Sequence, residues 1–460
     1  MFGFGRELRR LFGADATSVH RDGLTGGDVS LLELLDMRLL RQEAKSADIA
    51  AGRVSAKDPA QRRLEAAIIW REVARRSGDV AALRKAASTA EAAAGLFGRD
   101  RRPDGWARAR CEQASCALLG AELFGDEGLN AAADVAFREA RAAARGGLSR
   151  PIAEIGMLAV ESRARLADGD AQLARVSAAR FDAPIAGLKS FVRRSRDARL
   201  LLVEARLLRA DLLLGWGARL GDRALLQQAL VEVEAAGTNL DVDHEPLSWA
   251  RVITLRGQAL ALLGEAGGVV ETLIDGVNGL AEALDTLTRD HSPMDWARLQ
   301  TSLAQGLQAL GEATTSERAY EQAVTCYDRA GLVFKTSPAL ALRALAASNR
   351  ALCLARSAEL SGDLAVLDAA EAAFRIELSS LSAGREPVTW AMLQVNLARL
   401  YESRMDITGR DSGERAAATI ALSAAHDVFT EQGLRSLSLL ASDALERLRD
   451  WGSARAFRAS

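Results

Sequence analysis

The sequence predicts an all-α solenoid, in which one helical hairpin is stacked many times along the chain. The first observation is a motif, Pro-x-x-Trp-Ala, that recurs at a regular interval. The second is the composition, since hydrophobic residues make up 49% of the 460 residues but aromatic residues only 5%. Alanine and leucine supply most of the apolar content, which is typical of closely packed helices rather than of sheets.

The repeat is set by the prolines of this motif. Pro246 and Pro293 are 47 residues apart, and Pro293 and Pro387 are 94 apart, which is twice 47. The copy missing between them begins at Pro338, where Ala341 takes the place of the tryptophan. A period of this size indicates one structural unit stacked many times. The expected units begin at Pro59, Pro103, Pro151, near Ser195, and at Pro246, Pro293, Pro338 and Pro387.

The first helix of each unit is predicted by proline followed by apolar residues three and four positions apart. Proline suits the first helical turn, where its missing N–H has no partner in any case. We expect the repeat tryptophans to lie in the core, and this face in the 293 unit to consist of Trp296, Leu299, Leu303, Leu307 and Leu310. Trp216, between two glycines, breaks the period and is either a packed side chain or an exposed aromatic contact.

A Gly-Asp or Gly-Glu step is expected to end the first helix and begin the second. Glycine adopts the left-handed conformation that ends a helix, and aspartate caps the next one. The steps are Gly78–Asp79, Gly125–Asp126, Gly169–Asp170, Gly221–Asp222 and Gly362–Asp363, with Gly264–Glu265 and Gly311–Glu312 as variants.

The second helix has a pattern of small and large residues at spacings of four, three and four. The small residues allow helices to approach closely, and the large ones fill the space beside them. Two copies are Ala86, Ala90, Ala93, Phe97 and Ala323, Tyr327, Ala330, Phe334.

With Trp-x2-Leu in the first helix and Ala-x3-Tyr/Phe-x2-Ala in the second, the chain resembles the tetratricopeptide repeat family from about Pro59 to Phe429. The resemblance implies a right-handed superhelical α-solenoid of about eight helix-turn-helix repeats, with the first helices lining a concave surface. The units are elongated, since their starts lie 44 to 51 residues apart, whereas about 34 is usual in that family. A HEAT-like array is the alternative, because its repeats are about 40–47 residues long.

Along the chain we expect five regions. They are an amphipathic segment at 1–13, a flexible linker at 14–27, an N-terminal capping helix region at 28–58, the solenoid at 59–433, and a C-terminal capping helix with a tail at 434–460. In the capping region, Asp28 would begin one leucine-rich helix reaching Leu40. Its apolar surface is either buried as a cap or used for homodimerisation.

The amphipathic segment at 1–13 has two interpretations. It either binds a membrane surface or a partner, or folds onto the solenoid. Its residues of interest are apolar on one side and basic on the other: Phe2, Phe4, Leu8, Leu11 and Phe12 against Arg6, Arg9 and Arg10.

Composition and motifs argue against several classes of protein. The net charge of −2 gives no basic field for nucleic acid. Apart from the four scattered histidines, among which His244 and His291 share one repeat position, the sequence has no metal-ligand or phosphate-loop motif. We therefore expect no enzyme activity, no metal and no cofactor. The cysteines, read as small buried hydrophobes of a reducing, cytoplasmic compartment, are Cys111, Cys116, Cys326 and Cys353.

A polar pattern follows the repeat tryptophans. Arginine stands two residues after the tryptophan, or after Ala341, at Arg108, Arg251, Arg298 and Arg343, and polar residues follow seven positions later at Gln258, Gln305 and Arg350, with Arg399 in the next unit. The resemblance implies that basic residues at this place bind a peptide carboxylate, so Arg251, Arg298 and Arg343 would form a ladder on the concave face. The alternative is a charged surface whose arginines pair with neighbouring carboxylates.

The function predicted from these observations is that of a non-catalytic scaffold or adaptor. It would bind a partner protein along the concave face, and the arginines favour an acidic or C-terminal segment. Two alternatives remain open: a scaffold held at the inner face of the membrane by residues 1–13, and a self-assembling structural protein.

Overall fold

The computed structural model describes residues 29–53, 58–165, 170–193, 195–238, 240–381, 383–384, 387–432 and 434–458. Within these ranges the regular structure is helical and contains no strand, which confirms the predicted all-α class. The predicted segments at 1–13 and 14–27 lie outside the described residues.

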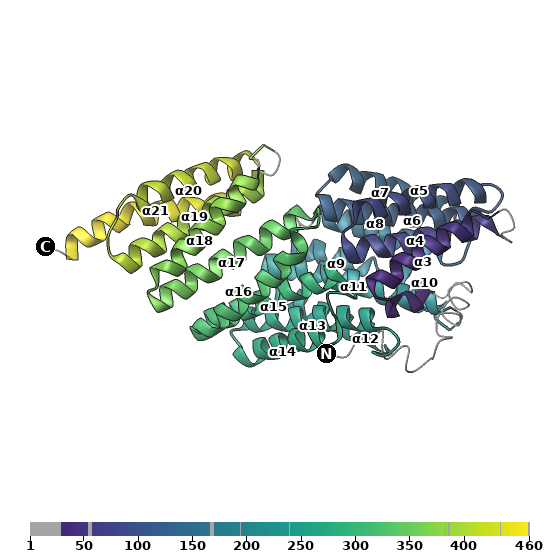
Figure 1. The fold of residues 1–460 in the computed structure, drawn as a ribbon, viewed down its shortest axis with the longest axis horizontal. Coiled ribbons are helices and arrows are strands. Elements are labelled where there is room, and N and C mark those ends of the chain that lie inside the picture. The colour runs from purple at the N-terminus through teal and green to yellow at the C-terminus, as the bar shows by residue number, and fades with distance from the viewer. Residues whose placement is uncertain are drawn as a thin grey trace. The chain divides into compact units, whose positions relative to one another are not determined.

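Contacts divide the chain into two compact units. The N-terminal unit comprises the chain up to Ser302 together with Thr336–Ala339, and the C-terminal unit comprises Leu303–Lys335 and Leu340–Ser460. Each is built from helical hairpins (Figure 1).

In the N-terminal unit a short 3-10 helix, η2 (Val29–Leu34), precedes the α-helices. These are α3 (Met37–Ala51), α4 (Pro59–Ser77), α5 (Val80–Phe97), α6 (Pro103–Phe124), α7 (Glu127–Ala143), α8 (Ser149–Arg165), α9 (Ala171–Ala179), α10 (Asp182–Lys189), α11 (Arg196–Leu220), α12 (Arg223–Gly237), α13 (Pro246–Gly267) and α14 (Val270–Thr286). The hairpins α4/α5, α6/α7, α11/α12 and α13/α14 make the most extensive contacts in this unit.

Helix α15 (Pro293–Thr314) begins in the N-terminal unit and continues into the C-terminal one. The remaining helices are α16 (Glu317–Phe334), α17 (Leu340–Ser361), α18 (Leu364–Ser380), α19 (Pro387–Thr408), α20 (Glu414–Glu431) and α21 (Arg435–Arg458). Side chains of α17 to α21 form one core cluster, in which Phe374, Tyr401 and Phe429 are the large members. Helix α21 covers the last hairpin by burying Ala441, Ala444 and Leu448.

The repeat starts predicted from the sequence are confirmed. Five first helices begin at a proline of the predicted set, and α11 begins directly after Ser195, whose hydroxyl accepts a hydrogen bond from Ala198 N. Helix α8 begins two residues before Pro151, and α17 begins two residues after Pro338. The second half of the third repeat is divided between two short helices, α9 and α10.

Four of the five predicted Gly-Asp turns are confirmed, and Gly169 of the fifth lies outside the described residues. At the first, Gly78 has φ 70° and ends α4, while the carboxylate of Asp79 accepts hydrogen bonds from Ala81 N at 2.9 Å and Ala82 N at 3.2 Å. The same geometry recurs at Gly125, Gly221 and Gly362, with φ between 63° and 71°.

The prediction of a turn at the two Gly-Glu variants was wrong. Helix α13 continues past Gly264 to Gly267, and α15 continues past Gly311 to Thr314. Both glycines instead permit close contact between the helices of a hairpin, since a Cβ on Gly264 would lie 2.5 Å from Leu273 N and one on Gly311 would lie 3.0 Å from the Tyr320 ring. The end of a helix and the close approach of two helices both favour glycine, so the Gly-Glu dipeptide alone cannot distinguish the two.

The prediction of a single leucine-rich helix after residue 28 was also wrong. The 3-10 helix η2 ends at Leu34, and α3 begins only at Met37, where the carboxylate of Asp36 accepts a hydrogen bond from Leu39 N at 2.8 Å. The apolar residues Leu32, Leu35 and Leu40 are nevertheless buried within the chain. Helix α3 lies beside α4 (Figure 1).

The aromatic residues behave partly as predicted. The repeat tryptophans at 106, 249, 296 and 390 are half-buried rather than fully buried. Trp216 is only 1% exposed, so the packed interpretation is confirmed and the exposed-contact interpretation is wrong. All four cysteines are buried as predicted, and burial raises the pKa of the Cys111 and Cys353 thiols to about 12.

The small-and-large pattern of the second helix joins one repeat to the next. Ala86, Ala90 and Ala93 are fully buried, and Phe97 at the end of α5 packs against Gly105 in the first turn of α6. A Cβ on Gly105 would lie 2.4 Å from the Phe97 ring, and Gly156 of α8 meets the Phe137 ring in the same way.

This contact predicts a non-additive pair of substitutions. Gly105→Ala should destabilise the protein by about 1–3 kcal/mol because the Phe97 ring must move. In a Phe97→Leu background the same change should cost less, because the smaller side chain leaves room. A double-mutant cycle from urea unfolding measures the coupling, and additive effects of the two changes would contradict the contact.

Candidate partner-binding site

A cavity in the N-terminal unit brings first helices of several repeats together. Its volume is about 70 Å³, and it is lined by residues of η2, α4, α6, α11 and α13. Because a bound water needs about 10–15 Å³ of such volume, the cavity has room for several waters or for one side chain of a partner. We call it the central cavity.

The walls of the central cavity are charged. Arg71, Glu72 and Arg75 of α4 lie on one side, and the other charged residues of the lining are Glu33 of η2, Arg108 of α6, Asp197 and Glu204 of α11, and Arg251 of α13. Four arginines and four carboxylates therefore share one small space, with a balanced formal charge.

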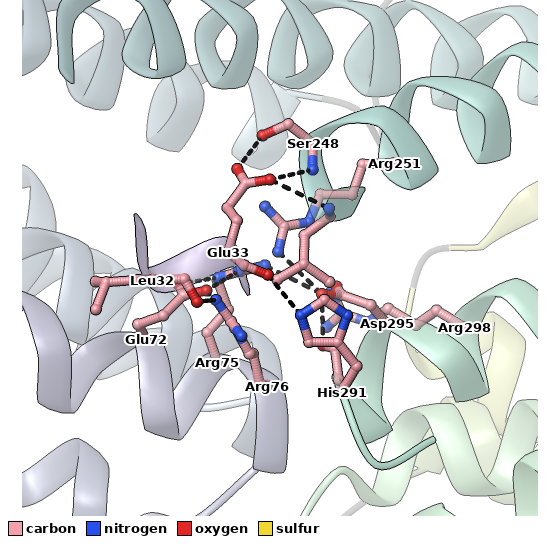
Figure 2. Close-up of polar contacts among 12 residues, drawn as sticks. Leu32, Glu33, Glu72, Arg75, Arg76, Ser248, Arg251, His291, Asp295 and Arg298 are labelled. Carbon is pink, nitrogen blue, oxygen red and sulfur yellow. Dashed lines mark hydrogen bonds and ion pairs between the residues drawn. The ribbon is translucent and has the colours of Figure 1, made fainter. Parts of the chain in front are cut away.

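Most of these arginines are paired with carboxylates of the same unit. Arg75 contacts Glu72, with 2.8 Å between Nε and Oε2, and reaches Asp295 at 3.3 Å. Arg251 donates to the same Asp295 oxygen at 2.9 Å, so one carboxylate joins α4 to α13 (Figure 2). Arg71 pairs with Glu112 of α6. These pairs hold the helices around the cavity.

Arg108 and Glu204 differ from these pairs. Within the ranges that the structure describes, neither side chain makes a hydrogen bond or an ion pair, although both line the central cavity. Arg108 is half-buried, and Glu204 is accessible to solvent in the cavity. The protein atoms surrounding Glu204 raise the pKa of its carboxyl group, against the effect of Arg71 and Arg75. A cationic partner group beside Glu204 would reverse that effect.

The side of α11 that lines the central cavity carries one further carboxylate, that of Asp211. Asp197, Glu204 and Asp211 are seven residues apart in turn, and this spacing places them on one side of the helix. Surrounding protein also raises the pKa of Asp211, while Arg163 and Arg298 oppose that shift.

The 3-10 helix η2 closes one side of the central cavity through Glu33. This side chain is 7% exposed, and its Oε2 accepts hydrogen bonds from Leu247 N at 3.1 Å and Ser248 N at 3.0 Å. The Ser248 hydroxyl donates to the other oxygen (Figure 2). These donors belong to the first turn of α13, whose own N-cap residue, Glu245, makes no capping bond. Glu33 therefore caps a helix more than 200 residues away in sequence.

Two further side chains hold the backbone of this segment. Arg76 is 0% exposed and donates to the carbonyl oxygens of Leu35 at 2.9 Å and Leu32 at 2.8 Å. Nε2 of His291 contacts the carbonyl oxygen of Glu33 and must donate, since a carbonyl only accepts (Figure 2). Burial and the neighbouring Arg76 lower the pKa of His291 to about 4, so the ring is neutral at pH 7.

This histidine predicts a pH dependence of stability. Between pH 6.5 and 4 the unfolded chain binds a proton at residue 291 that the folded chain does not, so folding is weakened as the pH falls. From pH 7 to pH 5 the wild-type protein should lose about 2 kcal/mol more than a His291→Gln variant, which keeps an N–H donor. Urea unfolding at both pH values gives the difference, and equal losses in the two proteins would contradict the assignment.

Arg251, Arg298, Arg343 and Arg350 of the predicted ladder set pair with carboxylates of the protein itself. In the N-terminal unit Arg251 pairs with Asp295, Arg298 with Glu122 of α6, and Gln258 with the Ser302 hydroxyl. In the C-terminal unit the corresponding residues are Arg343, paired with Glu377 at 3.6 Å, Arg350, paired with Asp328 at 2.6 Å, the exposed Gln305 and the half-buried Arg399. Only Arg251 of this set lines the central cavity, where Arg108 joins it.

Sequence reasoning missed the residues that complete this site. The sequence places His291 and His244 at one repeat position, yet His291 is buried against Glu33 while His244 is exposed beside Asp241. No local sequence pattern indicated a role for Glu33 or Arg76, because their partners are remote in sequence. The seven-residue spacing of carboxylates on α11 was a signal that could have been used.

Metal-binding clusters and membrane-spanning helices are absent from the described residues. No group of three or more His, Cys, Asp or Glu side chains there could hold a metal ion. No helix in that part of the chain is long and apolar enough to cross a membrane. The candidate contact residues Phe2, Phe4, Arg6, Leu8, Arg9, Arg10, Leu11 and Phe12 lie outside it.

Comparison with known proteins gives structural likeness only. No protein-family model matches the chain, and no curated protein matches its sequence. Among solved structures, a Rap protein complexed with competence and sporulation factor is similar at 10% identity, covering 85% of this chain and 98% of that one with a TM-score of 0.45. A circular tandem repeat protein is similar at 15% identity, covering 92% and 98% with a TM-score of 0.27. With TM-scores below 0.5, neither likeness bears on function.

Proposed function

We propose that this chain is a non-catalytic scaffold that binds a segment of a partner protein at the central cavity. The observation that carries the proposal is the presence of Arg108 and Glu204 in one cavity lined by the first helices of four repeats, where neither side chain makes a hydrogen bond or an ion pair with another described residue. Arg108 is half-buried there and loses part of its hydration, and a partner of opposite charge offsets that loss.

The charges of Arg108 and Glu204 indicate which side chains the partner segment should carry. The guanidinium of Arg108 suits an acidic side chain or a C-terminal carboxylate, with which it can form two parallel hydrogen bonds. Glu204 suits a basic side chain in the same segment. Arg251 and Arg298 of the predicted ladder already hold Asp295 and Glu122. A partner carboxylate would have to displace these residues, so Arg108 is the stronger candidate for the first contact.

Peptide selection tests this proposal. Peptides selected from a random library with the full chain are labelled and titrated against wild type and Arg108→Glu. Loss of a partly buried charged contact should weaken binding by about ten- to hundredfold, or about 1.5–3 kcal/mol. Circular dichroism checks that the variant remains helical.

A matched control comes from the second helix α7. Arg138 is 61% exposed and forms an ion pair with Asp134 of its own helix, so Arg138→Glu should leave peptide affinity unchanged. Peptides that bind Arg108→Glu as tightly as wild type would remove the central cavity as the binding site.

A further inference from the structure

Residues 29–36 contact the N-terminal unit in the way that a bound peptide contacts its receptor. Their polar bonds reach Arg76, the first turn of α13 and His291, which lie 41 to 258 positions away in sequence. The segment also precedes the predicted repeats instead of forming part of one. We call Arg76, His291 and the first turn of α13 the segment seat.

The segment seat recognises both side chain and backbone. The first turn of α13 and the Ser248 hydroxyl bind the Glu33 carboxylate, as a helix N-terminus binds an anion. The two bonds from Arg76 go to carbonyl oxygens, so they fix the backbone whatever the side chains are. Leu32 and Leu35 are buried at 4% and 6% exposure.

The occupant has a simple chemistry. Residues 31–35 read Leu-Leu-Glu-Leu-Leu, a carboxylate between two pairs of leucines. Leu32 and Glu33 also line the central cavity. The segment seat and the central cavity are therefore continuous, and a partner segment lying in the cavity would meet η2.

We propose that the segment seat is a second contact site for the partner, that it takes a partner segment in which a glutamate stands between leucines, and that residues 29–36 occupy it as an intramolecular competitor. This proposal rests on the proposed function, because it places the partner at the adjoining cavity. A tethered segment has an effective concentration in the millimolar range for a short linker, so an external segment with the same contacts binds weakly until the tethered one is displaced.

The test uses a fluorescein-labelled nonapeptide with the sequence of residues 28–36, titrated against the full chain by fluorescence anisotropy. In a Glu33→Lys chain the lysine is repelled by the first turn of α13, and the segment seat is left open. The nonapeptide should bind this chain at least about tenfold more tightly than wild type. A nonapeptide with lysine in place of its glutamate should not bind.

Glu91 of α5 provides the matched charge reversal, since it is exposed and makes no ion pair or hydrogen bond among the described residues. Glu91→Lys should bind the nonapeptide as weakly as wild type. A helical Glu33→Lys chain that takes up the nonapeptide no better than Glu91→Lys would overturn the proposal.

A second measurement needs no variant and so does not depend on Glu33→Lys folding. Millimolar nonapeptide added to wild type should speed amide hydrogen exchange in residues 32–36, and unchanged exchange there would also overturn the proposal.

Failure of the proposed function is distinguishable from failure of the segment seat. If Arg108-dependent peptides bind but the nonapeptide does not, the scaffold stands and the segment seat fails. If only the nonapeptide binds, the segment seat takes up its own segment, but the central cavity and with it the proposed function fail.

Discussion

Replacing Arg76 with methionine is expected to lower the free energy of unfolding of the N-terminal unit by about 3 to 5 kcal/mol, although the two side chains are similar in length. Arg76 is fully buried, and its removal leaves the carbonyl oxygens of Leu32 and Leu35 without donors. Buried acceptors without partners cost about 1–3 kcal/mol each. Glu72 would keep its bonds to Arg75, so the loss falls mainly on residues 29–36.

Urea unfolding and amide exchange together measure this effect. The unfolding midpoint should fall, and the amides of residues 32–36 should exchange faster than those of the rest of the unit. Arg84→Met on α5 is the control, because Arg84 is exposed and its change should stay within about 0.5 kcal/mol of wild type. An Arg76→Met protein as stable as Arg84→Met would show that the buried arginine does not hold the segment.

The second large effect is expected at Trp216. Its side chain packs in the cluster that joins α9, α10, α11 and α12, where Phe181, Leu188 and Leu225 are also buried. Trp216→Ala should cost about 3–5 kcal/mol, because it removes a large buried surface and leaves a cavity. Its unfolding midpoint in urea should shift accordingly.

Trp216→Phe separates packing from hydrogen bonding. The indole Nε1 is buried and has no acceptor among the described residues, so phenylalanine removes a donor that already lacks a partner. We expect Trp216→Phe to lose much less stability than Trp216→Ala. Equal losses in the two variants would mean that the indole N–H, rather than the packed ring, stabilises this cluster.

The repeat architecture could be predicted because its signals are local. Proline marks the first turn, glycine with positive φ ends the helix, and aspartate caps the next helix, as at Gly78 and Asp79. The periodic small and large residues then predict which faces are buried, and Phe97 and Phe334 are both 1% exposed. Each of these rules involves residues within one or two turns of each other.

The site could not be predicted to the same depth, because it depends on contacts between distant segments. Nothing near Glu33 indicates that its carboxylate caps α13, and nothing near Asp295 indicates that it joins Arg75 to Arg251. Local rules were also ambiguous at Gly264, where close helix packing and helix termination select the same residue. The arginine positions were predicted, but their carboxylate partners come from other helices.

A partner segment bound at the central cavity of the N-terminal unit should protect the helices that line it. Amide hydrogen exchange of the full chain, with and without a saturating selected peptide, measures this protection. We expect slower exchange in α4, α6, α11 and α13, and unchanged exchange in the C-terminal unit. Slower exchange confined to the C-terminal unit, or to the second helices α5, α7 and α12, would contradict this expectation.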